Sequence, residues 1–211
     1  MRVLALTILL LPLPAAAQHV PRMSDAEVAG LLGAGQELES RTDGDLNLDG
    51  EIDTVFVGRS DDKRTLTVML AEKSEVDLSH VPAGTLTLDP YPLGAASVTI
   101  AKGVLKIEDL TGGTTAISTV YRYRVVPLEM PRMRLIGLDA TLYSRTYAHD
   151  GFELSWNLLS GDQITREMRV NTSGGDAAYV KGAEKRAKRP SKPVFMEDTP
   201  ETEDVINAAR K

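Results

Sequence analysis

Oxygen-bearing side chains recur at close intervals in one short acidic segment, at Asp45, Asn47, Asp49 and Asp53, with a glycine at position 50. Calcium is a hard cation that takes six to eight oxygen ligands. Alternate residues of a tightly turning loop can point at one ion, and a glycine permits the sharp turn. The spacing therefore predicts a loop that binds one Ca²⁺ ion.

Each position in this loop has an expected role. Side-chain oxygens would come from Asp45, Asn47 and Asp49, a backbone carbonyl from Glu51, and the closing carboxylate from Asp53. The alternative is a plain turn, in which Asp and Asn side chains bond to nearby backbone amides. Carboxylates held this close together repel one another unless a cation neutralises them, so we favour the metal interpretation.

A helix–loop–helix calcium hand does not fit the segment. Its twelfth residue should be a bidentate glutamate, and counting from Asp45 that residue is Phe56, inside a run of strand-forming residues. The pattern D-x-N-x-D-G-x-x-D, followed directly by Thr54 to Val57, instead resembles the loops of FG-GAP and VCBS repeats. That resemblance implies calcium binding, as at blade edges of integrin-like propellers. The motif occurs once, which excludes a propeller of several blades.

The wider arrangement also resembles a group of uncharacterised bacterial exported proteins, in which such a loop precedes a β-meander. The stretches that carry this resemblance are 102–107, 121–124, 133–139 and 155–161. The resemblance implies an architecture and no activity.

The elements that would position the loop are mostly strands. Period-two patterns predict strands at 54–57, 65–71, 97–102, 104–109, 117–126, 133–138, 141–147, 152–159 and 163–170. Turn residues such as Lys102-Gly103 separate them. We therefore expect a mainly β fold, an antiparallel meander that forms a sheet, barrel or sandwich, with short helices near the two ends.

The expected helices flank the strands. Ser24 and Glu27 have the spacing of a capping box at the start of the first helix, and residues 200–210 predict the second, with Thr199 as its cap. Between the last predicted strand and the second helix, residues 181–192 carry six basic side chains. This run could engage an anionic cell-wall or membrane partner, or form a solvated tail.

The first residues are typical of an export signal. Arg2 is followed by the apolar run 3–13 and by three alanines at 15–17, which predicts cleavage before Gln18 and a periplasmic or secreted bacterial protein. An uncleaved anchor is disfavoured because Pro12 and Pro14 interrupt the run. The expected organisation is a signal peptide (1–17), an N-terminal helix and lead-in (18–44), a β domain (45–172) and a partly helical or disordered C-terminal tail (173–211).

Composition excludes several classes of function. The 211 residues contain no cysteine and carry a net charge of −6, which argues against thiolate chemistry and against a general attraction to nucleic acid. There is no phosphate-binding glycine motif. Three dispersed histidines also make a poor zinc site.

The catalytic alternative centres on His149 and Asp150, with Ser144 or Ser155 as a nucleophile, in a hydrolase acting on envelope material. No G-x-S-x-G motif accompanies these residues, and His149-Asp150-Gly151 also suits a turn. The sequence therefore favours an exported, non-enzymatic domain that calcium stabilises and that binds a protein or a cell-envelope component.

Overall fold

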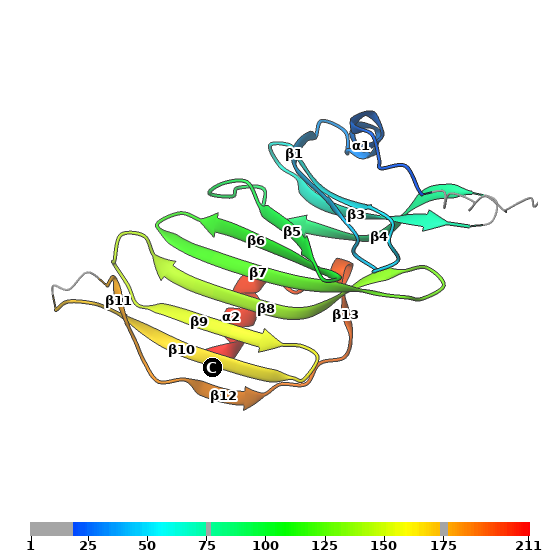
Figure 1. Cartoon of the computed structure of the whole chain (residues 1–211). Coiled ribbons are helices and arrows are strands. Elements are labelled where there is room, and N and C mark those ends of the chain that lie inside the picture. Colours follow the sequence, from blue (N-terminus) through cyan, green and yellow to red (C-terminus); the bar gives the residue numbers. More distant parts are fainter. Residues whose placement is uncertain (1–18, 75–76, 174–176) are drawn as a thin grey trace, which may run out of the picture.

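The structure is a computed structural model that describes residues 19–74, 77–173 and 177–211. The expected signal peptide 1–17 and the cleavage position before Gln18 lie outside these residues. The described chain is mainly β, as predicted, with antiparallel sheets and short helices near its two ends (Figure 1). Neither sheet closes into a barrel within the described residues.

The smaller sheet contains four strands in chain order, β1 (Glu37–Gly44), β2 (Asp53–Arg59), β3 (Arg64–Lys73) and β4 (Leu78–Leu88). Each strand pairs with the next in antiparallel fashion. The acidic loop is the connection between β1 and β2. Because β1 belongs to the expected lead-in and β2 to the expected β domain, the boundary at residues 44 and 45 falls inside one sheet.

The larger sheet is built on a six-strand meander, in the order β5 (Ser97–Ala101), β6 (Val104–Gly112), β7 (Thr115–Val126), β8 (Arg132–Ser144), β9 (Gly151–Asn157) and β10 (Asp162–Val170). The β5–β6 turn has positive φ angles at Lys102 and Gly103, as a two-residue hairpin requires. The two strands predicted at 133–138 and 141–147 form one continuous strand, β8.

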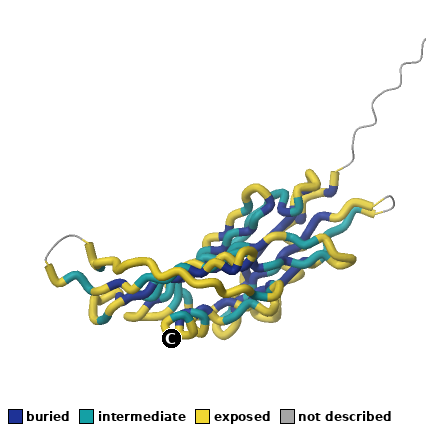
Figure 2. The backbone as a smooth tube through the Cα atoms, turned by 90° about the horizontal axis from the view of Figure 1, so that it is seen from below, coloured by how far each residue is buried: buried dark blue, intermediate teal, exposed yellow. Residues whose placement is uncertain are grey.

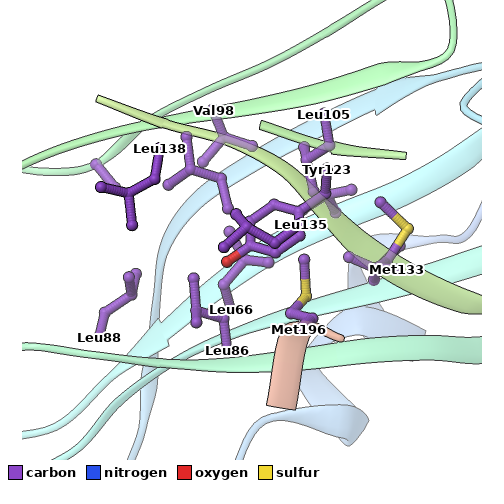
Figure 3. Close-up of a cluster of buried hydrophobic side chains, with 14 of the residues drawn as sticks. Leu66, Leu86, Leu88, Val98, Leu105, Tyr123, Met133, Leu135, Leu138 and Met196 are labelled. Atoms are coloured by element: carbon purple, nitrogen blue, oxygen red, sulfur yellow. The ribbon is translucent and has the colours of Figure 1, made fainter. Parts of the chain in front are cut away.

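The two sheets share one hydrophobic core (Figure 3). Leu66 and Leu86 of the small sheet and Leu105 and Leu135 of the large sheet belong to the same buried cluster. A hydrogen bond from Thr42 Oγ1 to the backbone oxygen of Val98, at 2.7 Å, joins β1 to β5. Apolar burial of this kind supplies most of the stabilisation of a sandwich.

The Tyr121–Arg124 segment alternates as a half-exposed strand should. Tyr123 is fully buried and its ring lies against that of Tyr121, with the centroids 6.3 Å apart. Arg122 pairs with Asp139, and Arg124 is exposed. The tyrosines therefore belong to the packed interior.

The first helix, α1 (Asp25–Leu31), begins with the predicted capping box: the amide of Glu27 donates to Ser24 Oγ and the amide of Ser24 donates to the Glu27 carboxylate. Its buried Val28 packs with Phe56 and Met69 in a second, smaller cluster. Among the described residues no helix is long and apolar enough to cross a bilayer.

The C-terminal segment is integrated into the fold. Strands β11 (Tyr179–Lys181) and β12 (Lys185–Lys188) both pair with β10, and β13 (Val194–Phe195) pairs with β8. A short 3-10 helix, η1 (Met196–Asp198), and α2 (Thr202–Ala209) follow. Met196 and Ile206 are fully buried in the main core. Figure 2 shows the backbone coloured by burial, with buried and exposed stretches alternating along the chain.

The cap predicted for the second helix is wrong. The helix begins at Thr202 with Glu201 as its N-cap, and no side chain caps it. The hydroxyl of Thr199 instead bonds to the backbone oxygen of Met196 and to the hydroxyl of Tyr123. Thr199 therefore closes the 3-10 turn that precedes the helix.

Candidate functional site

The acidic loop makes a sharp turn between two paired strands. Gly44 at the end of β1 pairs with Asp53 at the start of β2, so the ends of the loop are held together. Leu48 and Gly50 both have positive φ angles, of 66° and 90°. A positive φ costs a leucine more than it costs a glycine, so the surrounding contacts must maintain this turn.

Two side-chain oxygens of the loop converge on one amide. The N–H of Asp49 donates to Oδ1 of Asp45 at 3.1 Å and to Oδ1 of Asn47 at 3.2 Å. The second oxygen of Asp45 accepts from the N–H of Gly50 at 3.0 Å. The Asp45 and Asn47 oxygens therefore lie close to each other around the Asp49 amide.

Asp49 and Glu51 continue the turn in different ways. Oδ1 of Asp49 accepts from the amide of Glu51 at 2.8 Å, and Oδ2 accepts from Nδ2 of Asn47 at 2.7 Å. The Glu51 carboxylate turns away and accepts from the N–H of Val20 at 2.7 Å, close to the His19 ring. The expected contribution of Glu51 was its backbone carbonyl, and this side-chain anchor leaves that role open.

Asp53 occupies the base of the loop and is fully buried. Its carboxylate accepts from the N–H of Leu46 at 2.6 Å and from the N–H of Ala71, on β3, at 2.9 Å. Burial, together with the nearby charges of Asp49 and Asp45, raises the pKa of Asp53 to about 6, although the two backbone hydrogen bonds act to lower it. Asp53 thus joins the loop to the sheet, and the three carboxylates repel one another.

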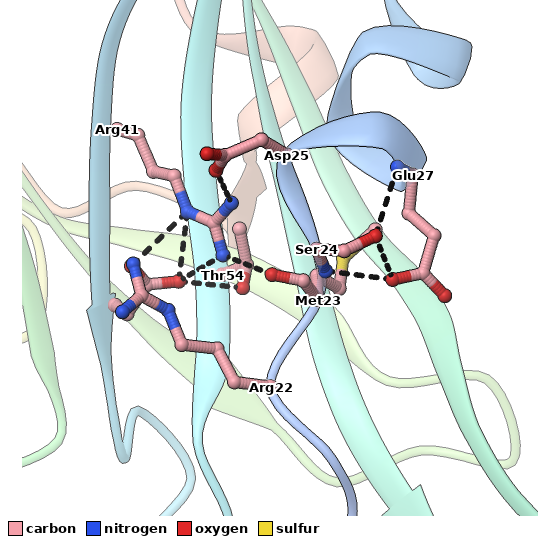
Figure 4. A network of polar contacts seen from close by, with 8 residues as sticks. Arg22, Met23, Ser24, Asp25, Glu27, Arg41 and Thr54 are labelled. Atoms are coloured by element: carbon pink, nitrogen blue, oxygen red, sulfur yellow. Dashed lines mark hydrogen bonds and ion pairs between the residues drawn. The ribbon is translucent and has the colours of Figure 1, made fainter.

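Three carboxylates of the neighbouring strands, Glu39, Asp43 and Asp109, have arginine partners. Asp43 accepts from Arg41 and Arg22, and Figure 4 shows these two guanidinium groups approaching the same point of β1 beside Thr54. By contrast, the structure gives Asp45, Asp49 and Asp53 no ion pair with any described residue. The base of the loop is therefore a partly buried negative site without a compensating cation.

Within the described residues, no three His, Cys, Asp or Glu side chains gather closely enough to hold a metal by themselves. A calcium ion in this loop would therefore depend on the Asn47 amide oxygen, a backbone carbonyl and water as well as on carboxylates. Calcium accepts all of these ligands.

The residues of the hydrolase alternative do not assemble a serine–histidine pair. Nε2 of His149 bonds to the hydroxyl of Thr115 at 2.8 Å, and its Nδ1 to the backbone oxygen of Asp150 at 2.7 Å. The Ser144 hydroxyl accepts from the amide of Ala148, and the Ser155 hydroxyl donates to Asp139. These bonds stabilise a turn and a strand pair.

Three of the six basic residues in the run 181–192 form local ion pairs. Lys181 lies against Glu153, Lys188 is 2.7 Å from Asp162, and Arg186 is 2.9 Å from Glu184. Exposed pairs of this kind contribute little stability each. They nevertheless reduce the net charge available to an anionic partner.

A buried ionic network between the sheets escaped the sequence analysis. Arg64 of β3, with a side chain 0% exposed, donates to both oxygens of Glu39 on β1 at 2.7 Å and to Asp109 on β6 at 2.9 and 3.1 Å. In sequence Arg64 follows Asp61-Asp62-Lys63 and looks like one more surface charge. Only the pairing of β1 with β2 and the packing of the two sheets reveal its partners.

Comparison of the chain with protein-family models, with curated proteins and with solved structures finds no match.

Proposed function

We propose that this protein is an exported, non-enzymatic domain that one Ca²⁺ ion stabilises through the loop at Asp45 to Asp53, and that it binds a protein or a cell-envelope component. Asp45, Asn47 and Asp49 provide side-chain oxygens, Glu51 its backbone carbonyl, and Asp53 a carboxylate at the base of the loop. The export part of the proposal rests on residues 1–17 alone.

One observation carries the calcium proposal: the fully buried Asp53 has neighbouring negative charges and no cationic partner among the described residues. A buried charge is stable when it is paired or when it coordinates a metal. Glu39, Asp43 and Asp109 are paired with arginines. A divalent ion would supply to the loop what arginine supplies to those three residues.

The hydrogen bonds within the loop are compatible with this role. A carboxylate oxygen that accepts one backbone N–H retains a further lone pair, so the bonds to Asp45 and Asp53 can orient these groups without exhausting them. A plain turn would use the same bonds. Calcium would not increase the stability of a plain turn, so the effect of calcium on unfolding distinguishes a plain turn from a calcium site.

Thermal unfolding in calcium and in a chelator tests the proposal. Calcium should stabilise the folded protein by about 2.7 kcal/mol when its concentration is 100 times the dissociation constant. Magnesium should have a smaller effect because it demands tighter octahedral geometry. The double variant Asp45→Asn/Asp49→Asn should lose the difference in melting temperature between calcium and chelator. Any hydrogen bonds that it loses affect both conditions equally and do not enter this difference.

A matched control is available in the exposed β2–β3 turn. The variant Asp61→Asn/Asp62→Asn removes the same charge from a segment outside the loop and should retain the full calcium response. If both double variants responded to calcium like the wild type, the ion would be acting through general charge screening. The proposed site would then be rejected.

The non-enzymatic part of the proposal is supported by the bonds of His149, which contact Thr115 and the Asp150 backbone and no serine. Export predicts a mature chain that begins at Gln18. Mass determination of the protein recovered from a bacterial host that expresses residues 1–211 checks this, and recovery of only the unprocessed chain would contradict it.

A further inference from the structure

A hollow lies on the larger sheet, near the edge formed by β10 and β11. It has a volume of about 560 Å³ and is lined by Tyr143, Tyr147, Tyr179, Met168, Arg145 and Lys181, among others. This volume falls within the roughly 300–1,000 Å³ of small-ligand sites, which are typically lined by apolar and aromatic groups with a few polar ones. The acidic loop contributes no residue to it.

The floor of the hollow is closely packed. Met168, which lines the hollow, pairs in β10 with Gly151 of β9 on one side and with Lys181 of β11 on the other. A Cβ atom at Gly151 would come within 2.7 Å of both the Leu142 backbone oxygen and Met168 Cε. The glycine therefore lets the buried Met168 side chain lie against β9, which fixes this part of the floor.

Some of the side chains that line the hollow already form hydrogen bonds or ion pairs within the protein, and others do not. The Tyr179 hydroxyl bonds to the backbone of Ser144 and His149 and so fixes one wall. No hydrogen bond or ion pair is recorded for the hydroxyls of Tyr143 and Tyr147 or for the guanidinium of Arg145, which the structure describes in full. Lys181 pairs with Glu153. Two phenol groups and one cation thus remain available to a ligand.

Tyr147 has a further peculiarity. Its φ angle is 57° and its side chain is 59% exposed, although it is a large aromatic residue. A non-glycine residue in this region is strained by about 1–3 kcal/mol, and such strain gathers at functional sites. Nothing in the packing of the fold requires a tyrosine ring at this position.

We propose that this hollow binds a carboxylated sugar unit of a polysaccharide, with the pyranose ring against Tyr143 and Tyr147 and the carboxylate on Arg145. Tyrosine presents a flat apolar face with a polar tip, which suits a ring that is apolar on its faces and hydroxylated at its rim. A guanidinium binds a carboxylate through two parallel hydrogen bonds. An open site with an exposed ring fits a unit within an extended chain.

This inference rests on the binding part of the proposed function, for which it names a ligand class, and is independent of the calcium site. Hyaluronan hexasaccharide, in which every second unit carries a carboxylate, is a suitable probe, and chitin hexasaccharide is its neutral counterpart. Calorimetric titration of the full mature chain should give saturable binding of the first and at least about tenfold weaker binding of the second. The titrations are run in calcium and in chelator, below the unfolding temperature in each.

Three variants make the result specific. Arg145→Gln should weaken binding of the charged probe by about tenfold. Tyr147→Gly should abolish detectable binding while the melting temperature stays equal or rises, because glycine relieves the positive φ. Tyr91→Ala, at a tyrosine 70% exposed outside the hollow, is the control and should bind like the wild type.

The outcomes separate the two proposals. Binding in both calcium and chelator supports the sugar site whether or not calcium stabilises the fold. Absence of saturable binding by the wild type, equal binding of the neutral probe, or unchanged binding by Tyr147→Gly would each overturn it. None of these results bears on the melting-temperature test of the acidic loop.

Discussion

The carboxylate of Asp53 accepts a hydrogen bond from the backbone N–H of Leu46 at 2.6 Å, and this contact spans the acidic loop from its last residue to its second. The same carboxylate reaches β3 through the amide of Ala71. The loop and the small sheet are therefore coupled through one buried acidic group. A change in the charge of that group should therefore change the free energy of unfolding of the whole domain.

The pH dependence of unfolding in chelator should reveal this coupling. Burial raises the folded-state pKa of Asp53 to about 6, from an ordinary value of 3.8. A raised pKa means that the protonated form favours folding, so this contribution is complete below about pH 4 and is lost as the pH rises through 6. The loss amounts to up to about 3 kcal/mol.

Urea unfolding of the wild type and of Asp53→Asn at a series of pH values measures this contribution. The variant should be less stable at acidic pH by about 1–3 kcal/mol, because an amide can accept at only one atom while two N–H groups face it. The difference between the two proteins should shrink between pH 4.5 and 7.5. A constant difference across this range would show that Asp53 is ionised throughout.

Arg64 should be the most sensitive charged position in the fold. Arg64→Met leaves Glu39 and Asp109 buried without a cation and should lower the free energy of unfolding by about 3–5 kcal/mol. Lys63→Met, at the exposed position next to it in the β2–β3 turn, should change it by less than about 0.5 kcal/mol. Denaturant titration checks both variants, and equal effects would contradict the buried network.

A triple variant, Arg64→Met/Glu39→Gln/Asp109→Asn, distinguishes the cost of orphaned charges from the cost of lost packing. Because it removes the two orphaned negative charges, it should be more stable than Arg64→Met alone. If the triple variant were the less stable protein, packing of the guanidinium rather than charge would account for the result.

The C-terminal helix should be needed for the stability of the main core. Ile206 is fully buried against it, and Ile206→Ala should cost about 2–4 kcal/mol. Glu203→Ala, on the exposed side of the same helix, is the matched control and should cost less than about 0.5 kcal/mol. Thermal and urea unfolding of both variants provide the measurement. A negligible loss for Ile206→Ala would mean that the helix is not docked in solution.

The hydrolase alternative makes its own prediction. If His149 acted as a general base, its replacement by alanine would abolish cleavage of activated esters such as p-nitrophenyl acetate. We expect instead that the wild type and His149→Ala both cleave this substrate at the background rate, because His149 bonds to Thr115 and to its neighbour's backbone oxygen. A rate that is clearly above background and is lost in the variant would revive the enzymatic interpretation.

Local signals predicted the parts of the fold that depend on neighbouring residues. The Ser24 and Glu27 capping box and the Lys102-Gly103 hairpin turn both occur as expected, because each is determined by a few adjacent residues. The acidic loop likewise lies at the entrance to β2. Its metal remains a prediction, since the hydrogen bonds of the loop suit both a plain turn and an ion site.

The strands that were missed depend on partners far along the chain. β1 is composed mostly of polar residues, and its Glu39 and Arg41 are satisfied by ion pairs with Arg64, Asp43 and Asp25. β4 contains Pro82 and Gly84, which normally argue against a strand.

Gly84 lets β4 lie close to two methionines, because a Cβ atom there would come within 3.0 Å of Met196 Sδ and 3.1 Å of Met133 Cγ. Neither methionine is near it in sequence. The residues that line the tyrosine-lined hollow are likewise far apart in sequence, since they come from β8, β10 and β11. Spacing along the chain gives no sign of such an assembly.

Calorimetric titration of chelator-treated protein with calcium chloride tests the central claim most directly. The account predicts saturable binding of one ion per chain, lost in Asp45→Asn/Asp49→Asn and retained in Asp61→Asn/Asp62→Asn. Titration heats that match those of calcium injected into buffer, together with equal melting temperatures in calcium and chelator, would contradict it and would leave the loop as a turn held by its own hydrogen bonds.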